Sequence, residues 1–254
     1  MTDAGGNGPV VLWHAGSPHT GALIAPVLAA AETARVRLVT WARPGYGGST
    51  RRPGRTVADG AADAAVVADA LGLGRFAAVG YSGGGPHAIV GGALLPGRVT
   101  AVATLAGIAP DTGSGDWLAG MASPAALTAA RLGLEARAAL PDDFDDDSLV
   151  EADRAALEGP WSALGDDAQA AGREGPFGLV DDDVAFAQPW GADLAAVTVP
   201  VLLAQGDADR IVPPTHARLL AEALPDAEVL LRPGDGHVSV LAALPEVLEW
   251  AAQH

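Results

Sequence analysis

The stretch Phe76-Ala77-Ala78-Val79-Gly80-Tyr81-Ser82-Gly83-Gly84 joins a short apolar run to a glycine-rich turn. Residues 76–79 are typical of a buried strand, and the pattern from Gly85 to Leu95 is typical of a helix. Glycines on both sides of a serine permit a cramped turn that pushes the serine into a strained, exposed position. The helix that follows begins with N–H groups that can stabilise a developing oxyanion. The stretch therefore predicts Ser82 as a nucleophile.

This short pattern is weak evidence alone, because 33 glycines among 254 residues make a chance match easy. A serine hydroxyl also needs a base that removes its proton, and the base needs a carboxylate that orients it. Of the six histidines, His237 stands out because it follows an apolar run at residues 229–231. Asp207 and Asp209 follow another apolar run at residues 199–204. The carboxyl ends of parallel strands meet at one edge of a sheet, so we expect these side chains near the serine.

Short apolar runs alternate with helical patterns along most of the chain, which is typical of a parallel sheet with crossover helices. About six parallel strands are expected, at residues 9–13, 36–41, 76–79, 99–105, 199–204 and 229–231. Residues 110–192 contain no convincing strand pattern. We therefore expect an α/β core of residues 1–109 and 193–254, with a mostly helical insertion at 110–192 that covers the site as a lid. Ser148-Leu149-Val150-Glu151 has the form of a capping box, so a helix is expected to begin there.

The net charge of −16 is concentrated in the expected insertion, where 17 acids and 4 arginines lie between Asp111 and Ala192. Its acid run at residues 142–147 is expected to be a solvated face. Such a charge disfavours nucleic acid as a partner and favours neutral or cationic small molecules over anionic ones.

The chain has no cysteine, which excludes disulfides and thiolate chemistry. A dinucleotide-binding fingerprint starting at Gly80 would need glycine at position 82, where this chain has serine. A dinucleotide-binding loop is therefore excluded here. We expect no metal and no cofactor.

The first residues show no signal-peptide pattern, and no apolar run approaches the roughly 20 residues that a membrane span requires. The sequence therefore predicts a cytoplasmic protein without a membrane partner.

Five motifs in sequence order resemble those of lidded α/β-hydrolase-fold enzymes, over nearly the whole chain. They are His14-Ala15-Gly16-Ser17-Pro18 for the oxyanion loop, Pro44-Gly45-Tyr46-Gly47-Gly48-Ser49 for a second loop, Gly80 to Pro86 for the nucleophile elbow, Gly206-x-x-Asp209-x-x-Val212-Pro213 for the acid and Gly236-His237 for the base. The resemblance implies that Ser82 is the nucleophile, His237 the general base and Asp209 the orienting acid. It also implies an oxyanion hole formed by the backbone N–H groups of Ser17 and Gly83.

Some members of the family carry the acid after the preceding strand, which makes Asp111 a second candidate. Asp207 is then interpreted as a loop residue that bonds its own backbone. Ala15 stands where relatives often have a second histidine. Only 13 residues precede His14, so no antiparallel hairpin is expected at the start of the fold. The strand at 36–41 would then be an open sheet edge, and we expect the N-terminal tail or a partner subunit of a homo-oligomer to cover it.

The expected activity is hydrolysis of a small, largely apolar carboxylic ester through an acyl-enzyme intermediate. Aminopeptidase, lactonase, C–C bond hydrolase and peroxide-forming activities remain open, because one fold hosts many reactions. A hydrolase-like ligand-binding protein with little turnover is the alternative from another class. The insertion carries six aromatic residues, most of them expected in its core and one or two in an apolar acyl pocket: Trp117, Phe144, Trp161, Phe177, Phe186 and Trp190.

Overall fold

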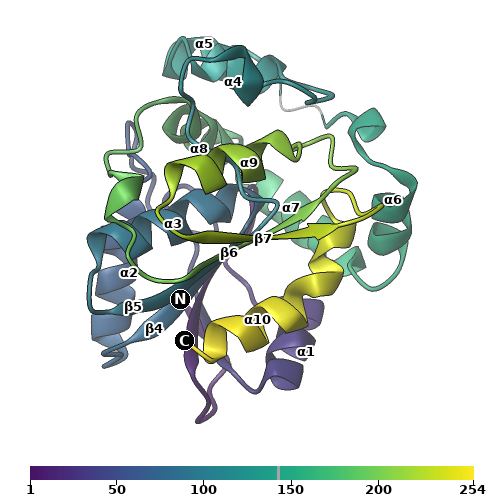
Figure 1. The fold of residues 1–254 in the computed structure, drawn as a ribbon. Helices are drawn as coiled ribbons and strands as arrows, with labels where there is room; N and C mark the ends of the chain where they lie inside the picture. The colour runs from purple at the N-terminus through teal and green to yellow at the C-terminus, as the bar shows by residue number, and fades with distance from the viewer. Residues whose placement is uncertain (142–143) are drawn as a thin grey trace.

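A central sheet organises the chain in a computed structural model that describes residues 1–141 and 144–254. Within those residues the sheet has seven strands in the order β1-β3-β2-β4-β5-β6-β7, and every neighbouring pair except β1–β3 is parallel (Figure 1). The strands are β1 (Thr2–Asp3), β2 (Val10–His14), β3 (Arg37–Thr40), β4 (Phe76–Tyr81), β5 (Val99–Leu105), β6 (Val201–Gly206) and β7 (Ala227–Arg232). The predicted α/β class with a mostly parallel sheet is confirmed.

The edge of β3 is covered by the N-terminal tail. Residues Thr2 and Asp3 pair antiparallel with Thr40 and Val39. The Asp3 carboxylate also binds the Arg37 guanidinium, with Oδ1 accepting from Nε at 3.0 Å. The prediction that the tail covers this edge is confirmed by a single short strand rather than a hairpin. A partner subunit at this edge stays a proposal.

Two helical layers enclose the sheet. Helices α1 (Ala25–Ala34) and α10 (Leu244–Ala252) pack on one face, and α2 (Asp59–Ala70), α3 (Gly85–Leu94) and α9 (Thr215–Ala223) pack on the other (Figure 1). All six residues of β4 are buried, because alternate side chains point into each of the two cores. Burial on both faces explains why the central strands β2, β4, β5 and β6 are mostly apolar runs rather than alternating patterns, whereas the edge strand β7 is largely exposed.

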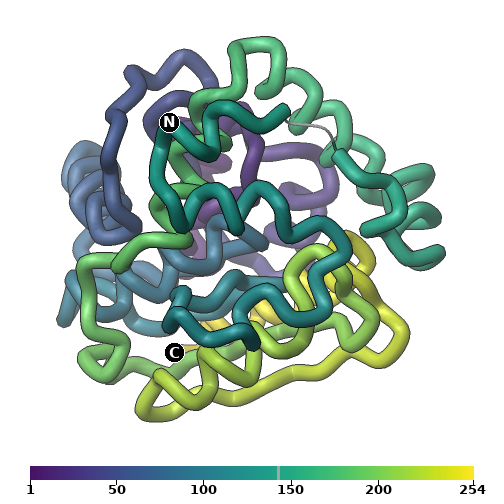
Figure 2. The backbone as a smooth tube through the Cα atoms, turned by 90° about the horizontal axis from the view of Figure 1, so that it is seen from above, coloured from purple at the N-terminus to yellow at the C-terminus, as the bar shows by residue number. Residues whose placement is uncertain are grey.

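Between β5 and β6 the described part of the chain forms helices and turns, which lie at the upper end of the molecule and along one side of it (Figures 1 and 2). The α-helices are α4 (Ala125–Ala130), α5 (Leu134–Ala138), α6 (Glu151–Glu158), α7 (Ser162–Gly172) and α8 (Phe177–Ala187). Helices α4, α5 and α8 contact one another, and α6 contacts α7. Among the described residues, no helix has the length and apolar character needed to cross a membrane.

The start of α6 differs from the prediction. The helix begins at Glu151 rather than at Ser148, which instead ends a 3-10 turn (Asp146–Ser148). The carboxylate of Asp153, not of Glu151, accepts the backbone N–H of Val150 at 3.3 Å. Burial of Leu149 and of Asp153 against the core fixes where the helix starts, and a local capping pattern cannot reveal that contact. Asp145, Asp146 and Asp147 lie at the surface, and the remaining acids of that run, Asp142 and Asp143, lie outside the described residues.

Candidate active site

The turn after β4 holds Ser82 in a left-handed conformation with a φ of 51°. A 3-10 turn (Ser82–Gly84) follows and leads directly into α3. A β-carbon on Gly80 would lie 2.4 Å from the carbonyl oxygen of Gly84. One on Gly84 would lie 1.9 Å from the carbonyl oxygen of His14. Both positions therefore require glycine, and the backbone strain at Ser82 is held by this close packing.

Ser82, His237 and Asp209 come together at the carboxyl ends of β4, β7 and β6. The Nε2 atom of His237 lies 2.9 Å from the Oγ atom of Ser82, and its Nδ1 atom lies 2.8 Å from Oδ2 of Asp209. The other carboxylate oxygen, Oδ1, accepts the backbone N–H groups of Ile211 at 2.8 Å and Val212 at 2.9 Å. These bonds orient the carboxylate toward Nδ1. Nδ1 then carries the proton, and Nε2 is free to accept a proton from the serine hydroxyl.

The two residues expected to form an oxyanion hole lie side by side next to Ser82. A β-carbon on Gly83 would lie 2.5 Å from the Oγ atom of Ser17. A β-carbon on Gly16 would lie 3.5 Å from that of Ser82. Gly83 also lies in the 3-10 turn Ser82–Gly84 that leads into α3. The loop around Ser17 therefore lies directly beside Ser82 and Gly83.

Two other acidic residues singled out in the sequence lie apart from His237. Asp111 accepts two hydrogen bonds from Arg131, at 2.5 Å from Nε and 2.8 Å from Nη2. Asp207 accepts the backbone N–H of Gly234 at 2.7 Å. It therefore braces the loop that leads to His237, and the interpretation that it bonds its own backbone is wrong.

A pocket of about 620 Å³ contains Ser82 and His237. Its size falls in the range that holds a drug-sized ligand. Apolar side chains from the core and from the insertion form much of its wall: Ile24, Val27, Leu149, Leu157, Trp161, Leu164, Ile211 and Leu241. Two carboxylates, Asp146 and Asp167, also line it, and no arginine does so among the described residues.

The six aromatic residues of the insertion divide between core, surface and pocket. Phe144 and Trp161 line the pocket, as expected for one or two of them. Trp117, Phe186 and Trp190 are buried in the main core. Phe177 lies at the surface, and the Arg51 guanidinium stacks over its ring at 4.1 Å.

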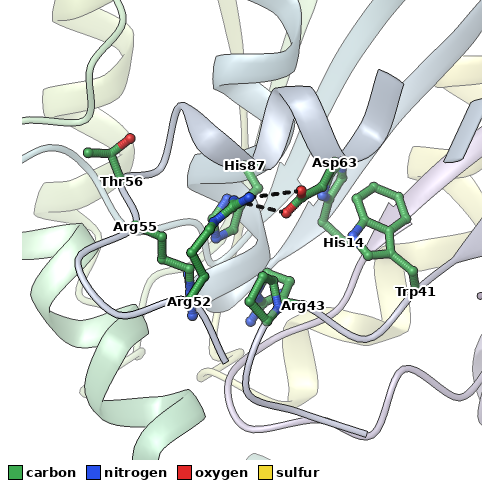
Figure 3. A pocket seen from close by; sticks show the side chains of 10 residues that line it. His14, Trp41, Arg43, Arg52, Arg55, Thr56, Asp63 and His87 are labelled. Atoms are coloured by element: carbon green, nitrogen blue, oxygen red, sulfur yellow. Dashed lines mark hydrogen bonds and ion pairs between the residues drawn. The ribbon is translucent and has the colours of Figure 1, made fainter. Parts of the chain in front are cut away.

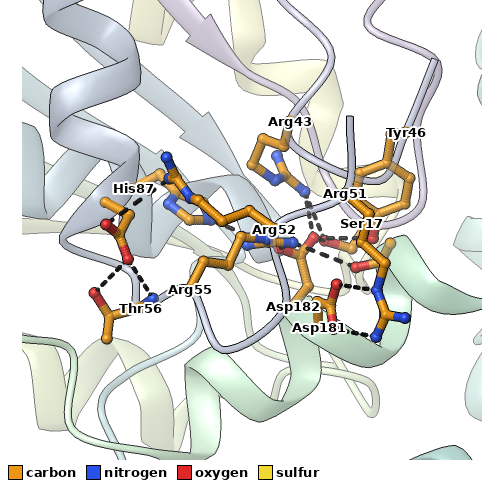
Figure 4. Close-up of polar contacts among 12 residues, drawn as sticks. Ser17, Arg43, Tyr46, Arg51, Arg52, Arg55, Thr56, His87, Asp181 and Asp182 are labelled. Carbon is orange, nitrogen blue, oxygen red and sulfur yellow. Dashed lines mark hydrogen bonds and ion pairs between the residues drawn. The ribbon is translucent and has the colours of Figure 1, made fainter. Parts of the chain in front are cut away.

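A buried polar cluster in contact with the Ser17 loop was not predicted from the sequence. Its centre is Asp182 of α8, which is fully buried and accepts hydrogen bonds from Ser17 Oγ at 2.5 Å and Tyr46 Oη at 2.9 Å (Figure 4). Arg43 and Arg55 also donate to it, at 2.8 Å and 2.5 Å. Burial alone would raise the pKa of Asp182, but the two guanidinium groups hold that pKa well below its usual range.

Arg43 connects this cluster to the backbone of the same loop. It donates to the carbonyl oxygens of Ala15 at 2.6 Å and Gly16 at 3.0 Å, and these bonds hold the backbone of the loop in place. The sequence signal for the cluster was the run of three acids at 181–183 inside an apolar helical segment. Successive helical residues point in different directions, and the other residues of this helix are mostly apolar, so part of the acid run is expected to face the core. Such a run indicates at least one buried, paired carboxylate.

His14 and His87 line a small cavity beside this cluster, and Arg43 and Arg55 of the cluster form part of its wall. The cavity measures about 10 Å³, enough for roughly one water molecule, and the Arg52–Asp63 ion pair closes one side of it (Figure 3). Burial lowers the pKa of both histidines below the usual range, so both are neutral at neutral pH. The side chain of His87 is buried in the core.

Residues 1–141 and 144–254 contain no group of three or more side chains that could hold a metal ion.

The mostly parallel sheet, with Ser82 on a strained strand-to-helix turn beside His237, defines a protein of the α/β-hydrolase type. The family model for the alpha/beta hydrolase fold matches residues 8–243, and the chain belongs to that family.

Known proteins similar to this chain differ in activity. A bromoperoxidase from Bacillus anthracis is 26% identical, with a TM-score of 0.75 and coverage of 99% of this chain and 92% of that one. An enol-lactonase from Burkholderia xenovorans LB400 is 20% identical, with a TM-score of 0.68 and coverage of 98% and 93%, and shares the fold. Rhodomycin D methylesterase DauP from Streptomyces sp. (strain C5) is 46% identical over 52 residues, which span 20% of this chain and 17% of that protein.

Proposed function

We propose that the protein hydrolyses carboxylic esters through an acyl-enzyme formed on Ser82. The observation that carries this proposal is the pair of contacts made by the His237 ring, 2.9 Å to Ser82 Oγ and 2.8 Å to Asp209 Oδ2. A serine paired in this way to an oriented histidine is the arrangement that activates a hydroxyl nucleophile.

In the proposed reaction, Ser82 Oγ attacks the ester carbonyl carbon while Nε2 of His237 takes the hydroxyl proton. The carbonyl oxygen becomes an oxyanion, which the backbone N–H groups of Ser17 and Gly83 stabilise. The tetrahedral intermediate collapses, the C–O bond of the alcohol breaks, and His237 returns the proton to the leaving oxygen. Water then attacks the acyl-enzyme by the same route and releases the carboxylic acid.

The pocket supports a largely apolar substrate, because aliphatic side chains and Trp161 form much of its wall. Its volume of about 620 Å³ supports a bulkier ester than the small one expected from the sequence. Asp146 and Asp167 on the wall support a neutral or cationic substrate over an anionic one. The acidic surroundings act through the local potential and therefore depend on ionic strength.

The test is a panel of chromogenic esters with acyl groups of increasing size, in neutral, cationic and anionic versions, with a matched amide and lactone. The Ser82→Ala and His237→Ala variants are each expected to lose roughly 10³-fold or more of kcat/KM. Ser114→Ala, at an exposed serine of the insertion, is the matched control and keeps full activity. An equally active Ser82→Ala enzyme would contradict the mechanism.

Labelling by a serine-directed fluorophosphonate separates the remaining alternatives. Labelling of Ser82 with rapid turnover of esters supports the proposal, and a preference for the amide or the lactone assigns another reaction to the same residues. Labelling without turnover of any substrate favours the hydrolase-like ligand-binding protein.

A further inference from the structure

The insertion supplies a carboxylate to the loop that carries His237. Asp153 lies in the first turn of α6, 84 positions before His237 in the sequence. Its side chain is fully buried, at 0% exposure. A buried carboxylate is costly unless hydrogen-bond donors surround it, so the groups that face Asp153 decide what it does.

Three successive backbone N–H groups of the His237 loop point at this carboxylate. His237 donates to Oδ2 at 3.1 Å, while Val238 and Ser239 each donate to Oδ1 at 2.8 Å. The hydroxyl of Ser239 also donates to Oδ1, at 2.9 Å. Together with the N–H of Val150, the donors are four backbone N–H groups and one hydroxyl, none of which carries a full charge.

These N–H groups lie at the start of the 3-10 helix Ser239–Ala243. Successive N–H groups that converge in this way form an anion-binding concavity, which Asp153 fills from another part of the fold. The hydroxyl of Ser239 accepts the N–H of Gly236 at 2.7 Å and so extends the network to the residue before His237. The backbone from Gly236 to Ser239 is thereby held at each residue.

The closeness of Asp153 also explains the glycine of the Gly236-His237 motif. A β-carbon on Gly236 would lie 2.1 Å from Oδ2 of Asp153. Any larger residue there would push the carboxylate away from the loop. The motif therefore depends on a residue of the insertion that no local sequence pattern connects to it.

We propose that Asp153 is a positioning residue for His237, which sets the place of the imidazole between Ser82 and Asp209. Catalysis by a general base depends on reacting atoms being held within a fraction of an ångström. The backbone of His237 is bonded directly to Asp153, so a shift of this carboxylate moves the ring. This inference rests on the proposed function of Ser82 and His237 and assigns a specific role to the insertion, beyond covering the site.

The test uses Asp153→Asn in the full-length protein. The amide keeps the shape of the side chain but replaces one accepting oxygen by an NH2 group. Because both oxygens of Asp153 accept backbone N–H groups, that NH2 group faces N–H donors in either orientation and their hydrogen bonds are lost. We expect kcat for the best ester to fall about 10- to 100-fold, with KM within about twofold of the wild type, because substrate contacts are unchanged. The rate of Ser82 labelling by fluorophosphonate should fall by a similar factor, since that step also needs His237 as a base.

Asp181→Asn is the matched control. Asp181 is a buried carboxylate of the insertion, on α8, bonded to Arg51 at 2.8 Å through both Nε and Nη2 and outside the described contacts of the triad. We expect its kcat to stay within about twofold of the wild type. Ser239→Ala removes the two hydrogen bonds of the Ser239 hydroxyl, the one it donates to Asp153 and the one it accepts from Gly236. The carboxylate and its backbone donors stay, so we expect a smaller loss of kcat, about 3-fold. If Asp153→Asn does not fold, this milder variant carries the test.

The outcomes separate this inference from the proposed function. Unchanged kcat and labelling rates in both Asp153→Asn and Ser239→Ala, or a loss expressed only in KM, would overturn the positioning role. An equal loss in Asp181→Asn would also overturn it, because the effect would then be general to the insertion. A wild type that is labelled but hydrolyses no ester refutes only the proposed function, since the labelling rates still test Asp153. A wild type that is not labelled refutes both.

Discussion

Replacement of His216 by asparagine should make the protein less sensitive to acid. His216 lies in the first turn of α9 with no exposed surface, and its Nδ1 atom accepts the backbone N–H of Ala109 at 3.0 Å. Burial lowers the pKa of this imidazole to about 4, although the nearby charge of Asp209 opposes the shift. Protonation would also place a second proton donor against the N–H of Ala109. The native state therefore holds His216 neutral.

The pH dependence follows from the difference between the folded and unfolded states. The unfolded chain takes up a proton near pH 6.5, whereas the folded protein resists it until about pH 4. The unfolded state then binds more protons, so stability is lost as the pH falls between these two values. At pH 5 this single group lowers the free energy of unfolding by about 2 kcal/mol relative to pH 7.5, given its pKa of about 4.

The assay is urea unfolding of the wild type and of His216→Asn, each at pH 7.5 and pH 5.0. Asparagine can keep an acceptor for the N–H of Ala109 but does not titrate. Any packing cost of the smaller side chain is present at both pH values and cancels within each protein. We expect the variant to lose about 2 kcal/mol less than the wild type on acidification. An equal loss in the two proteins would refute a depressed pKa at His216.

Two further substitutions test the site and the turn that presents it. Asp209→Asn should lower kcat about 10⁴-fold, because His237 loses the acceptor that fixes its tautomer, while Asp111→Asn should leave kcat within about twofold. Steady-state kinetics check both, and the reverse order of effects would move the acid to Asp111. Gly84→Ala should destabilise the protein by about 3 kcal/mol or more, because its β-carbon would meet a backbone oxygen at 1.9 Å. Gly74→Ala, which meets no atom within 4 Å, is its control in thermal unfolding, and equal melting temperatures would contradict the steric argument.

The sequence alone indicated the architecture of the core. Strands buried on both faces appear as continuous apolar runs, and β5 (Val99–Leu105) begins and ends where its run does. The turn at Ser82 was also evident, because Gly80 and Gly84 are demanded by contacts within a few residues or with one neighbouring loop. Apolar strand runs and the glycines of a tight turn both depend on residues close together in the chain. They therefore leave a direct pattern in the amino-acid sequence.

Contacts between distant segments left no such pattern. Nothing near Asp153 or Asp182 indicates which loop each carboxylate faces, although one holds the backbone of His237 and the other the side chain of Ser17. The start of α6 was misplaced for the same reason, since burial against the core outweighs a local cap. The size of the pocket likewise depends on how the residues between β5 and β6 that line it pack against the core.

The core sheet, the Ser82 turn and the order of its candidate partners could be predicted from the amino-acid sequence, because strand periodicity and glycine requirements act over short stretches of chain. The tertiary structure was needed to show that Asp209 lies within hydrogen-bond distance of His237, and His237 of Ser82, while Asp111 pairs with Arg131 instead. It also decided that the insertion contributes buried carboxylates to both loops beside the serine. The physical reason is that a buried carboxylate is stabilised by donors from whichever segments fold against it, and those segments are fixed only by the packing of the whole chain.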